Sequence, residues 1–294
     1  MKKLSFLFIS FFFSIAFSIA IFSGCSSAPK KATEIFSDRN TAIKQLDLAN
    51  LTANRGQYEK ALEILEEARK IAVSTDDPPL RLKTSMSRGN FLFALGRYTE
   101  AFAEWESASS EGDSSGETVL AALARIYSIR AKIVLLDAES GAATVQELKD
   151  QLNREMTAVK SNDNATAVGN ITLGFAEKQT GRWVDAENAV KKALSYHESG
   201  LFLEDAAYDW FLIASIRSLA GNYDAALDAL RTSIRFDRRA ENGFGLASSW
   251  QAMGDVLSKA GRGGEAQAAW RRAAEIYRAI DLNDLAEKIE GLIQ

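Results

Sequence analysis

Small and large apolar residues recur along the chain in one fixed register relative to a set of glycines. Five segments align without gaps at intervals of 40, 85, 40 and 40 residues, and they begin at Gly56, Gly96, Gly181, Gly221 and Gly261. Each has a small residue five and twelve positions after the glycine and a larger apolar residue nine after it. Alanine or glycine stands seven positions before each glycine. Such self-similarity predicts a repeated supersecondary unit.

The register predicts two antiparallel helices in each unit. The positions five and twelve after the glycine are seven residues apart and therefore share one helix face. The glycine permits the left-handed backbone that ends the preceding helix. The chain has only 3 prolines among 294 residues, and no stretch beyond residue 25 alternates apolar and polar residues as a strand would. We therefore predict an all-α fold of stacked helix pairs, because one pair alone cannot bury its apolar face.

The interval of 85 residues between Gly96 and Gly181 is close to two periods. We interpret it as holding a degenerate pair, without the small-residue register, around a turn near Asp137–Gly141. Leu282, Leu285, Ile289, Leu292 and Ile293 form an apolar stripe suited to a final capping helix. The predicted pairs lie at about residues 34–75, 79–112, 116–160, 163–199, 202–241 and 243–280, and the cap at 282–294.

The repeat resembles the tetratricopeptide repeat. The residues that carry this resemblance are the turn and second-helix register together with Trp210, Ile213 and Ala214, and again Trp250, Met253 and Gly254, on first helices. The resemblance implies a right-handed helical-repeat solenoid. Two features depart from the family pattern: the period is longer than the usual one of about 34 residues, and the proline that commonly closes each repeat is missing. Neither departure changes the expected architecture.

Residues 1–25 have a different character. Lys2 and Lys3 precede an apolar run from Leu4 to Phe22, and Cys25, the only cysteine, follows Gly24. This layout resembles a bacterial lipoprotein signal peptide at 1–24, in which Cys25 is acylated and residues 25–33 form a tether. The alternative is an uncleaved anchor, since about 20 apolar residues span a bilayer. We expect a lipid-anchored protein of the bacterial envelope, on the periplasmic face of either membrane or on the cell surface.

Charge and motifs narrow the function further. Removal of residues 1–24 changes the net charge from -4 to -6, which suits a nucleic-acid backbone poorly. We find no nucleophile elbow, metal-binding histidine pair, P-loop or dinucleotide fingerprint. We therefore expect no enzyme, no cofactor, no metal and no nucleic-acid partner. His197, the only histidine, lies near the end of a second helix, where we expect a partly exposed structural residue.

The resemblance also implies a binding groove lined by first-helix residues. Carried over onto this sequence, the groove residues are Asn50, Asn54, Asn90, Phe93, Phe175, Lys178, Gln179, Tyr208, Phe211, Ser215, Asp255 and Lys259. The alternative for the aromatic members is packing against the degenerate pair or a second copy. The carboxylate-clamp variant of the family has lysine four residues before the first asparagine, where Leu46 stands here, so that mode of binding acidic C-terminal tails is not implied.

These features favour an adaptor or scaffold that binds envelope proteins or peptide segments. The alternative is an accessory component of an envelope transport or assembly machine, which would bind a small apolar solute or dock a periplasmic binding protein. An adaptor needs an open groove, whereas a solute carrier needs an enclosed apolar cavity with a few polar groups. A homo-oligomer is compatible with either hypothesis.

Overall fold

The computed structural model describes residues 36–136 and 141–293, and all regular secondary structure in them is helical. Cys25, the predicted signal peptide and the tether lie outside these residues. The described helices are α2 (Ser37–Asn54), α3 (Tyr58–Ser74), α4 (Pro78–Ala94), α5 (Tyr98–Ser115), α6 (Thr118–Leu135), α7 (Ala142–Val159), α8 (Asp163–Gln179), α9 (Trp183–Ser199), α10 (Leu203–Leu219), α11 (Tyr223–Ala240), α12 (Gly243–Lys259), α13 (Gly263–Ala279) and α14 (Asn283–Glu290).

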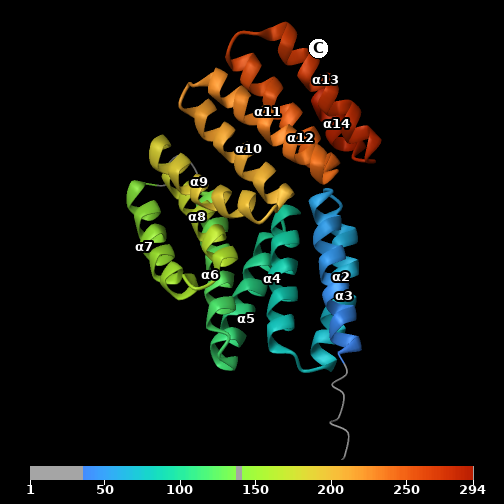
Figure 1. The fold of residues 1–294 in the computed structure, drawn as a ribbon, viewed down its shortest axis with the longest axis vertical. Helices are drawn as coiled ribbons and strands as arrows, with labels where there is room; N and C mark the ends of the chain where they lie inside the picture. Colours follow the sequence, from blue (N-terminus) through green and yellow to red (C-terminus); the bar gives the residue numbers. More distant parts are fainter. Residues whose placement is uncertain (1–35, 137–140, 294) are drawn as a thin grey trace, which may run out of the picture. The chain divides into compact units, whose positions relative to one another are not determined.

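Consecutive helices pack as antiparallel pairs, from α2 with α3 to α12 with α13, and α14 follows the last pair (Figure 1). The predicted all-α solenoid of six pairs and a final helix is confirmed for the described part of the chain. The long period arises from long helices joined by short turns: α8 and α9, for example, each have 17 residues. Helices of this length extend each repeat beyond the length that is usual in the family without changing its plan.

The glycines that open the register have the backbone that the sequence predicts. Gly56, Gly96, Gly181, Gly221 and Gly261 have φ values from 71° to 80°, in the left-handed region that glycine enters without steric cost. The residues five positions later are all fully buried in the second helices, from Ala61 to Ala266. The small residues of the register therefore lie buried in the contacts between helices, as predicted.

A second set of left-handed turns joins most pairs to the helix that follows, and the sequence did not reveal it. Asp76, Leu201, Glu241 and Asp281 have φ values of 49° to 63°, and Gly116 has 80°. These turns carry no consistent residue type, because only Gly116 supplies the glycine that would signal them. A non-glycine residue in this region is strained by roughly 1–2 kcal/mol, so packing of the neighbouring helices must impose it.

The third pair, α6 and α7, departs from the others as expected. α6 contacts α4, α5, α7 and α8, and its buried side chains include Ile126, Ile129 and Ile133. The connection from α6 to α7 spans residues 136–141, and α5, α6 and α7 each have 18 residues. These additions account for most of the excess of the interval between Gly96 and Gly181 over two periods.

The capping helix is shorter than predicted and only partly apolar on its buried side. α14 ends at Glu290, and its buried residues are Ala286 and Ile289. Leu282 packs against the last core cluster, whereas Leu285 and Leu292 are exposed. The apolar stripe is therefore not buried as a whole: Leu285 lies within α14 but faces outward, and Leu292 lies beyond the end of the helix.

Candidate functional site

Residues far apart in the sequence meet where the first pair approaches the fifth and sixth. The Asn54 side-chain amide at the end of α2 donates a hydrogen bond to a carboxylate oxygen of Glu204 in α10. A Cβ atom built on Gly56 would lie 2.8 Å from Cδ2 of Phe244 at the start of α12. The repeats therefore bring α2 and the turn before α3 next to α10 and α12, which belong to the other half of the chain.

Tyr208 on α10 lies on the surface that this arrangement encloses. Its side chain is 44% exposed, yet burial by the surrounding protein raises its pKa. Asp209 adds to this rise, whereas the positive charge of Arg130 on α6 opposes it. Burial also raises the pKa of Tyr58 on α3, with a further contribution from Tyr208. A side chain that water reaches but protein surrounds is expected in a concave surface.

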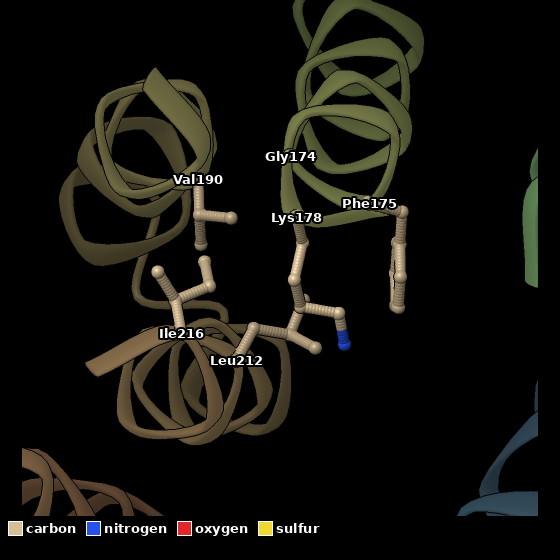
Figure 2. Close-up of a pocket in the computed structure, with 6 residues that line it drawn as sticks. All are labelled: Gly174, Phe175, Lys178, Val190, Leu212 and Ile216. Atoms are coloured by element: carbon tan, nitrogen blue, oxygen red, sulfur yellow. The ribbon is translucent and has the colours of Figure 1, made fainter. Parts of the chain in front are cut away.

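Lys178 and Phe175 on α8 border a pocket on the same surface. The pocket has a cavity volume of only about 10 Å³ and is lined by Gly174, Phe175, Lys178, Val190, Leu212 and Ile216, from α8, α9 and α10 (Figure 2). The Lys178 ammonium lies 5.0 Å from the centroid of the Phe175 ring, within the range of a cation–π interaction. Burial lowers the pKa of Lys178, so its charge is partly desolvated.

A second cation–aromatic pair comes from the degenerate pair of helices. The Arg130 guanidinium lies 5.0 Å from the centroid of the Tyr127 ring, both on α6. We call the surface formed by Asn54, Tyr58, Tyr127, Arg130, Phe175, Lys178, Glu204 and Tyr208 the inner face. It combines aromatic rings with positive charges, which can bind apolar and anionic groups together.

Four predicted groove residues already have partners within the fold. The indole N–H of Trp270 donates to Asp255 Oδ1 at 2.9 Å, and Gln179 donates to the backbone carbonyl of Ile133 at 3.0 Å. Phe93 packs against Tyr98 and Trp105 of its own pair. Phe211 is half-buried against the core cluster of the C-terminal repeats. These side chains hold helices together, at least in part, and are less available to a partner.

The other predicted polar positions differ in exposure. Asn54 and Lys259 are exposed, whereas Asn50, Asn90 and Ser215 are half-buried. Oδ1 of Asn90 is buried and accepts no hydrogen bond from the described residues. An unsatisfied buried acceptor of this kind is costly unless water or a ligand donates to it. Among the three predicted groove asparagines, Asn90 therefore has a buried, unsatisfied hydrogen-bond acceptor.

Sequence reasoning missed Tyr58, Tyr127, Arg130 and Glu204. Tyr58 stands two positions after Gly56, outside the predicted groove positions, and Tyr127 and Arg130 lie in the pair where the register is lost. Glu204 is one of many surface carboxylates by pattern. No spacing rule places α3 beside α10, so only the arrangement of the repeats identifies these four residues.

Two buried polar clusters lie between the C-terminal helices. His197 Nδ1 is 2.6 Å from Asp209 Oδ2, and both side chains are buried, so the expectation of a partly exposed histidine was wrong. Burial raises the pKa of Asp209 to about 6, against the opposing hydrogen bond with His197. Burial lowers the pKa of His197, but the bond with Asp209 outweighs it and raises that pKa above its ordinary value. The pair links α9 to α10 and has no access to a substrate.

The second cluster centres on Asp237 of α11. Asn242 donates to its carboxylate at 2.9 Å, and burial raises its pKa to about 7. Ser233 and Ser249 are hydrogen-bonded to each other at 3.0 Å, which explains a serine at a register position otherwise held by alanine. Within the described residues there is no group of three or more metal-ligating side chains, and no helix is both long and apolar enough to cross a membrane.

Comparisons with known proteins agree with this fold. Residues 41–75, which cover most of α2 and α3, match the tetratricopeptide repeat family. No curated protein matches the chain. The crystal structure of a Rap protein complexed with Competence and Sporulation Factor has a TM-score of 0.58 at 12% identity, over 86% of this chain and 74% of that one.

Two other solved structures match with lower scores. The TPR2AB domain of yeast Sti1 in complex with pHSP90 has a TM-score of 0.35 at 15% identity, over 87% of this chain and 98% of that one. The TPR-like repeats of a putative kinesin light chain from Podosopora anserina give 0.35 at 15% identity, over 85% and 99%. Residues 41–75 thus match one tetratricopeptide repeat, and the helices pack in consecutive pairs as in tetratricopeptide-repeat solenoids.

Proposed function

We propose that this chain is an adaptor that binds a polypeptide segment of a partner protein on its inner face. The observation that carries the proposal is Tyr208, a large aromatic side chain that is both solvent-accessible and enclosed by protein. Exposed aromatic residues grouped on one surface mark interaction sites, and tyrosine is enriched among the residues that dominate binding energy.

A polypeptide segment fits the inner face better than an enclosed solute. The pocket beside Lys178 has a cavity volume of about 10 Å³, far below the roughly 300–1,000 Å³ of small-molecule sites. The Rap structure, similar in fold, was solved as a complex with Competence and Sporulation Factor, which agrees with binding on such a scaffold.

Photocrosslinking in intact cells tests this function. A photoreactive phenylalanine analogue at position 208 should crosslink to a partner, because the inner face holds it. The matched control is the same analogue at Val184, which is 74% exposed on α9, a second helix of its pair. Equal yields of the same crosslinked species at both positions, or none at 208, would contradict binding on the inner face.

We further propose that residues 1–25 direct the protein to the bacterial envelope and anchor it by lipid on Cys25. The support is the basic start, the apolar run and the cysteine directly after Gly24. Cys25→Ala should leave an unprocessed precursor, or a soluble form if cleavage continues. Partition into detergent measures this, and a variant that still behaves as a processed lipidated protein would refute the anchor.

A further inference from the structure

The first helix of the first pair has a face that no preceding pair covers among the described residues. In the later repeats, the position five residues before the register glycine is at most 5% exposed, and it is held by Phe91, Ala176, Ile216 and Val256. Ile216 shows what buries this position, since it lines a pocket together with Val190 of the preceding second helix, α9 (Figure 2). Leu51 holds the same position in α2 and is 39% exposed.

Leu48 is exposed for the same reason. Its equivalents Ile213 and Met253 are buried in the core of the C-terminal repeats, whereas Leu48 is 47% exposed. A terminal repeat of a solenoid needs a polar outer face to stay soluble. The first pair instead keeps two leucines on this face, and they are neighbours on the helix surface because they stand three residues apart.

Two cations continue the line of these leucines along α2. Lys44 stands one turn before Leu48, and Arg55 stands one turn after Leu51; both cations are exposed. Spacings of four, three and four residues place all four side chains on one helix face, and Asp47 stands off that face. We call Lys44, Leu48, Leu51 and Arg55 the outer stripe.

The outer stripe does not suit a further stacked helix of the same kind. The position of Lys44 is buried in the later repeats and is held there by Thr84, Gly169, Asp209 and Ser249. In the fifth pair, Asp209 contacts His197 of the preceding second helix. A helix stacked in this way on the first pair would bury the Lys44 ammonium, and burial of an unpaired charge costs free energy.

A phospholipid surface satisfies both kinds of side chain in the outer stripe. Leucine side chains enter the boundary between head groups and acyl chains, and lysine and arginine attract anionic head groups. Residues 26–36 separate Cys25, the proposed site of lipidation, from the first residue of α2. A chain of this length reaches at most about 40 Å, so the anchor would hold α2 close to the membrane.

We propose that the outer stripe docks α2 onto an anionic phospholipid surface. Leu48 and Leu51 enter the interface, and Lys44 and Arg55 bind phosphate groups of the surrounding lipids. This inference rests on the proposed envelope anchor and adds a second membrane contact to it. The anchor limits the distance of the solenoid from the membrane, and the outer stripe sets its orientation.

Fluorescence quenching in vesicles tests the proposal with the full-length chain. Thr41, an exposed residue one turn before Lys44, is replaced by cysteine and labelled with a nitrobenzoxadiazole dye. Acylation of Cys25 leaves the introduced thiol as the one that reacts. The vesicles contain phosphatidylethanolamine, phosphatidylglycerol and a nitroxide-labelled lipid. The dye at position 41 should be quenched several-fold more than the same dye in Val184→Cys, at a position that is 74% exposed on α9.

Variants of the outer stripe separate its apolar and charged parts. Leu48→Ser with Leu51→Ser should remove most of the quenching at position 41 without lowering the melting temperature, because both leucines are exposed. Lys44→Gln with Arg55→Gln should reduce the quenching several-fold. Vesicles of phosphatidylcholine alone should reduce it to the same extent for the unchanged stripe, since they carry no net negative charge.

The matched control is Lys192→Gln with Arg238→Gln, which removes two exposed cations from α9 and α11 and should leave the quenching unchanged. An anchored protein whose dye at position 41 is quenched no more than the dye at position 184 would overturn the docking of α2 and leave the anchor in place. Quenching that persists in the double leucine variant would overturn it as well. A photoreactive group at Leu51 that crosslinks to a protein in place of lipid would assign the outer stripe to a partner helix and overturn lipid docking.

The wild-type chain tells a failure of the anchor from a failure of the outer stripe. A wild-type chain that takes up the dye has a free thiol at Cys25, which refutes the lipid anchor. The outer stripe alone should then still sediment part of the protein with the phosphatidylglycerol vesicles, and the double leucine variant should sediment less. Absence of sedimentation in that case would overturn the docking of α2 together with the anchor.

Discussion

In the contact between the two helices of a pair, a small residue of the first helix faces a larger residue of the second. We expect a change in the size of one to be tolerated only when the size of the other changes in the opposite direction. In the second pair, a Cβ atom added to Gly89 on α4 would lie 2.5 Å from Nε1 of Trp105 on α5. The equivalent positions of the first and fifth pairs hold Ala49 with Leu65 and Ala214 with Leu230. Glycine stands opposite tryptophan at Gly89 and Gly254 and opposite valine at Gly174, whereas alanine stands opposite leucine.

Gly89→Ala should therefore destabilise the protein. Contacts this close force Trp105 to move, and the indole is nearly fully buried, so overpacking should cost about 1–3 kcal/mol. The gain in helix propensity returns at most about 1 kcal/mol. We expect a net loss of roughly 1 kcal/mol in the free energy of unfolding, measured by urea denaturation followed by circular dichroism.

A double-mutant cycle gives the decisive measurement. Trp105→Leu alone should destabilise by about 2 kcal/mol or more through the cavity that it leaves. Combined with Gly89→Ala, it recreates the Ala–Leu pair of the other repeats, so the two changes should couple favourably by about 1–2 kcal/mol. The control is Gly264→Ala in α13, where an added Cβ would meet nothing within 4 Å and should stabilise by roughly 0.5–1 kcal/mol. Additive effects, or a stabilising Gly89→Ala, would refute this account of the register.

Three further predictions concern the polar cluster and the turns. Asp237 has a folded pKa of about 7, raised from 3.8, so between these pH values it keeps a proton that the unfolded chain has lost, and stability should fall as pH rises from about 4 to about 7. Asp237→Asn should reduce this slope and raise stability at pH 8 by at least about 1 kcal/mol in urea melts. An unchanged slope would contradict the raised pKa of Asp237. Gly56→Ala should destabilise more than Gly96→Ala, since both glycines have positive φ but only Gly56 faces Phe244; equal losses would show that the first pair does not contact the sixth in solution. Leu201→Gly should raise the melting temperature, because the left-handed strain at φ 57° is relieved at an exposed position, and a fall would indicate that the leucine packs.

The fold was predictable because the packing of each helix pair depends on the spacing of small and large apolar residues within one repeat. The small residues after Gly56, and the same positions in the later repeats, each identify a helix face that only a stacked pair can bury. The positive φ of the five glycines followed from the same register. The turns at Leu201 and Glu241 were not predictable, because tertiary packing there imposes a backbone that the local residues disfavour.

The inner face was predictable only in part, for a reason that lies in the architecture itself. A repeat specifies its contact with the next repeat, but the small rotation at each step decides which distant helices come together. Asn54 could be placed on a first-helix face from sequence, whereas its contact with Glu204, 150 residues later, could not. The burial of His197 was missed for the same reason, since its partner Asp209 belongs to the next pair.

The departure of the third pair from the register has a functional meaning. Positions that the register fills with small residues are committed to packing and cannot vary without loss of stability. In α6 the register is absent, and the helix instead carries Tyr127 with the Arg130 guanidinium over its ring, whose charge acts on Tyr208. α6 approaches α5 closely only near its start, where Ala121 faces Gly112, and farther along it packs through larger side chains such as Ile126 and Ile133. It is thereby free to carry side chains that the other repeats do not carry, and the sequence segment that fits the repeat least well supplies part of the proposed binding surface.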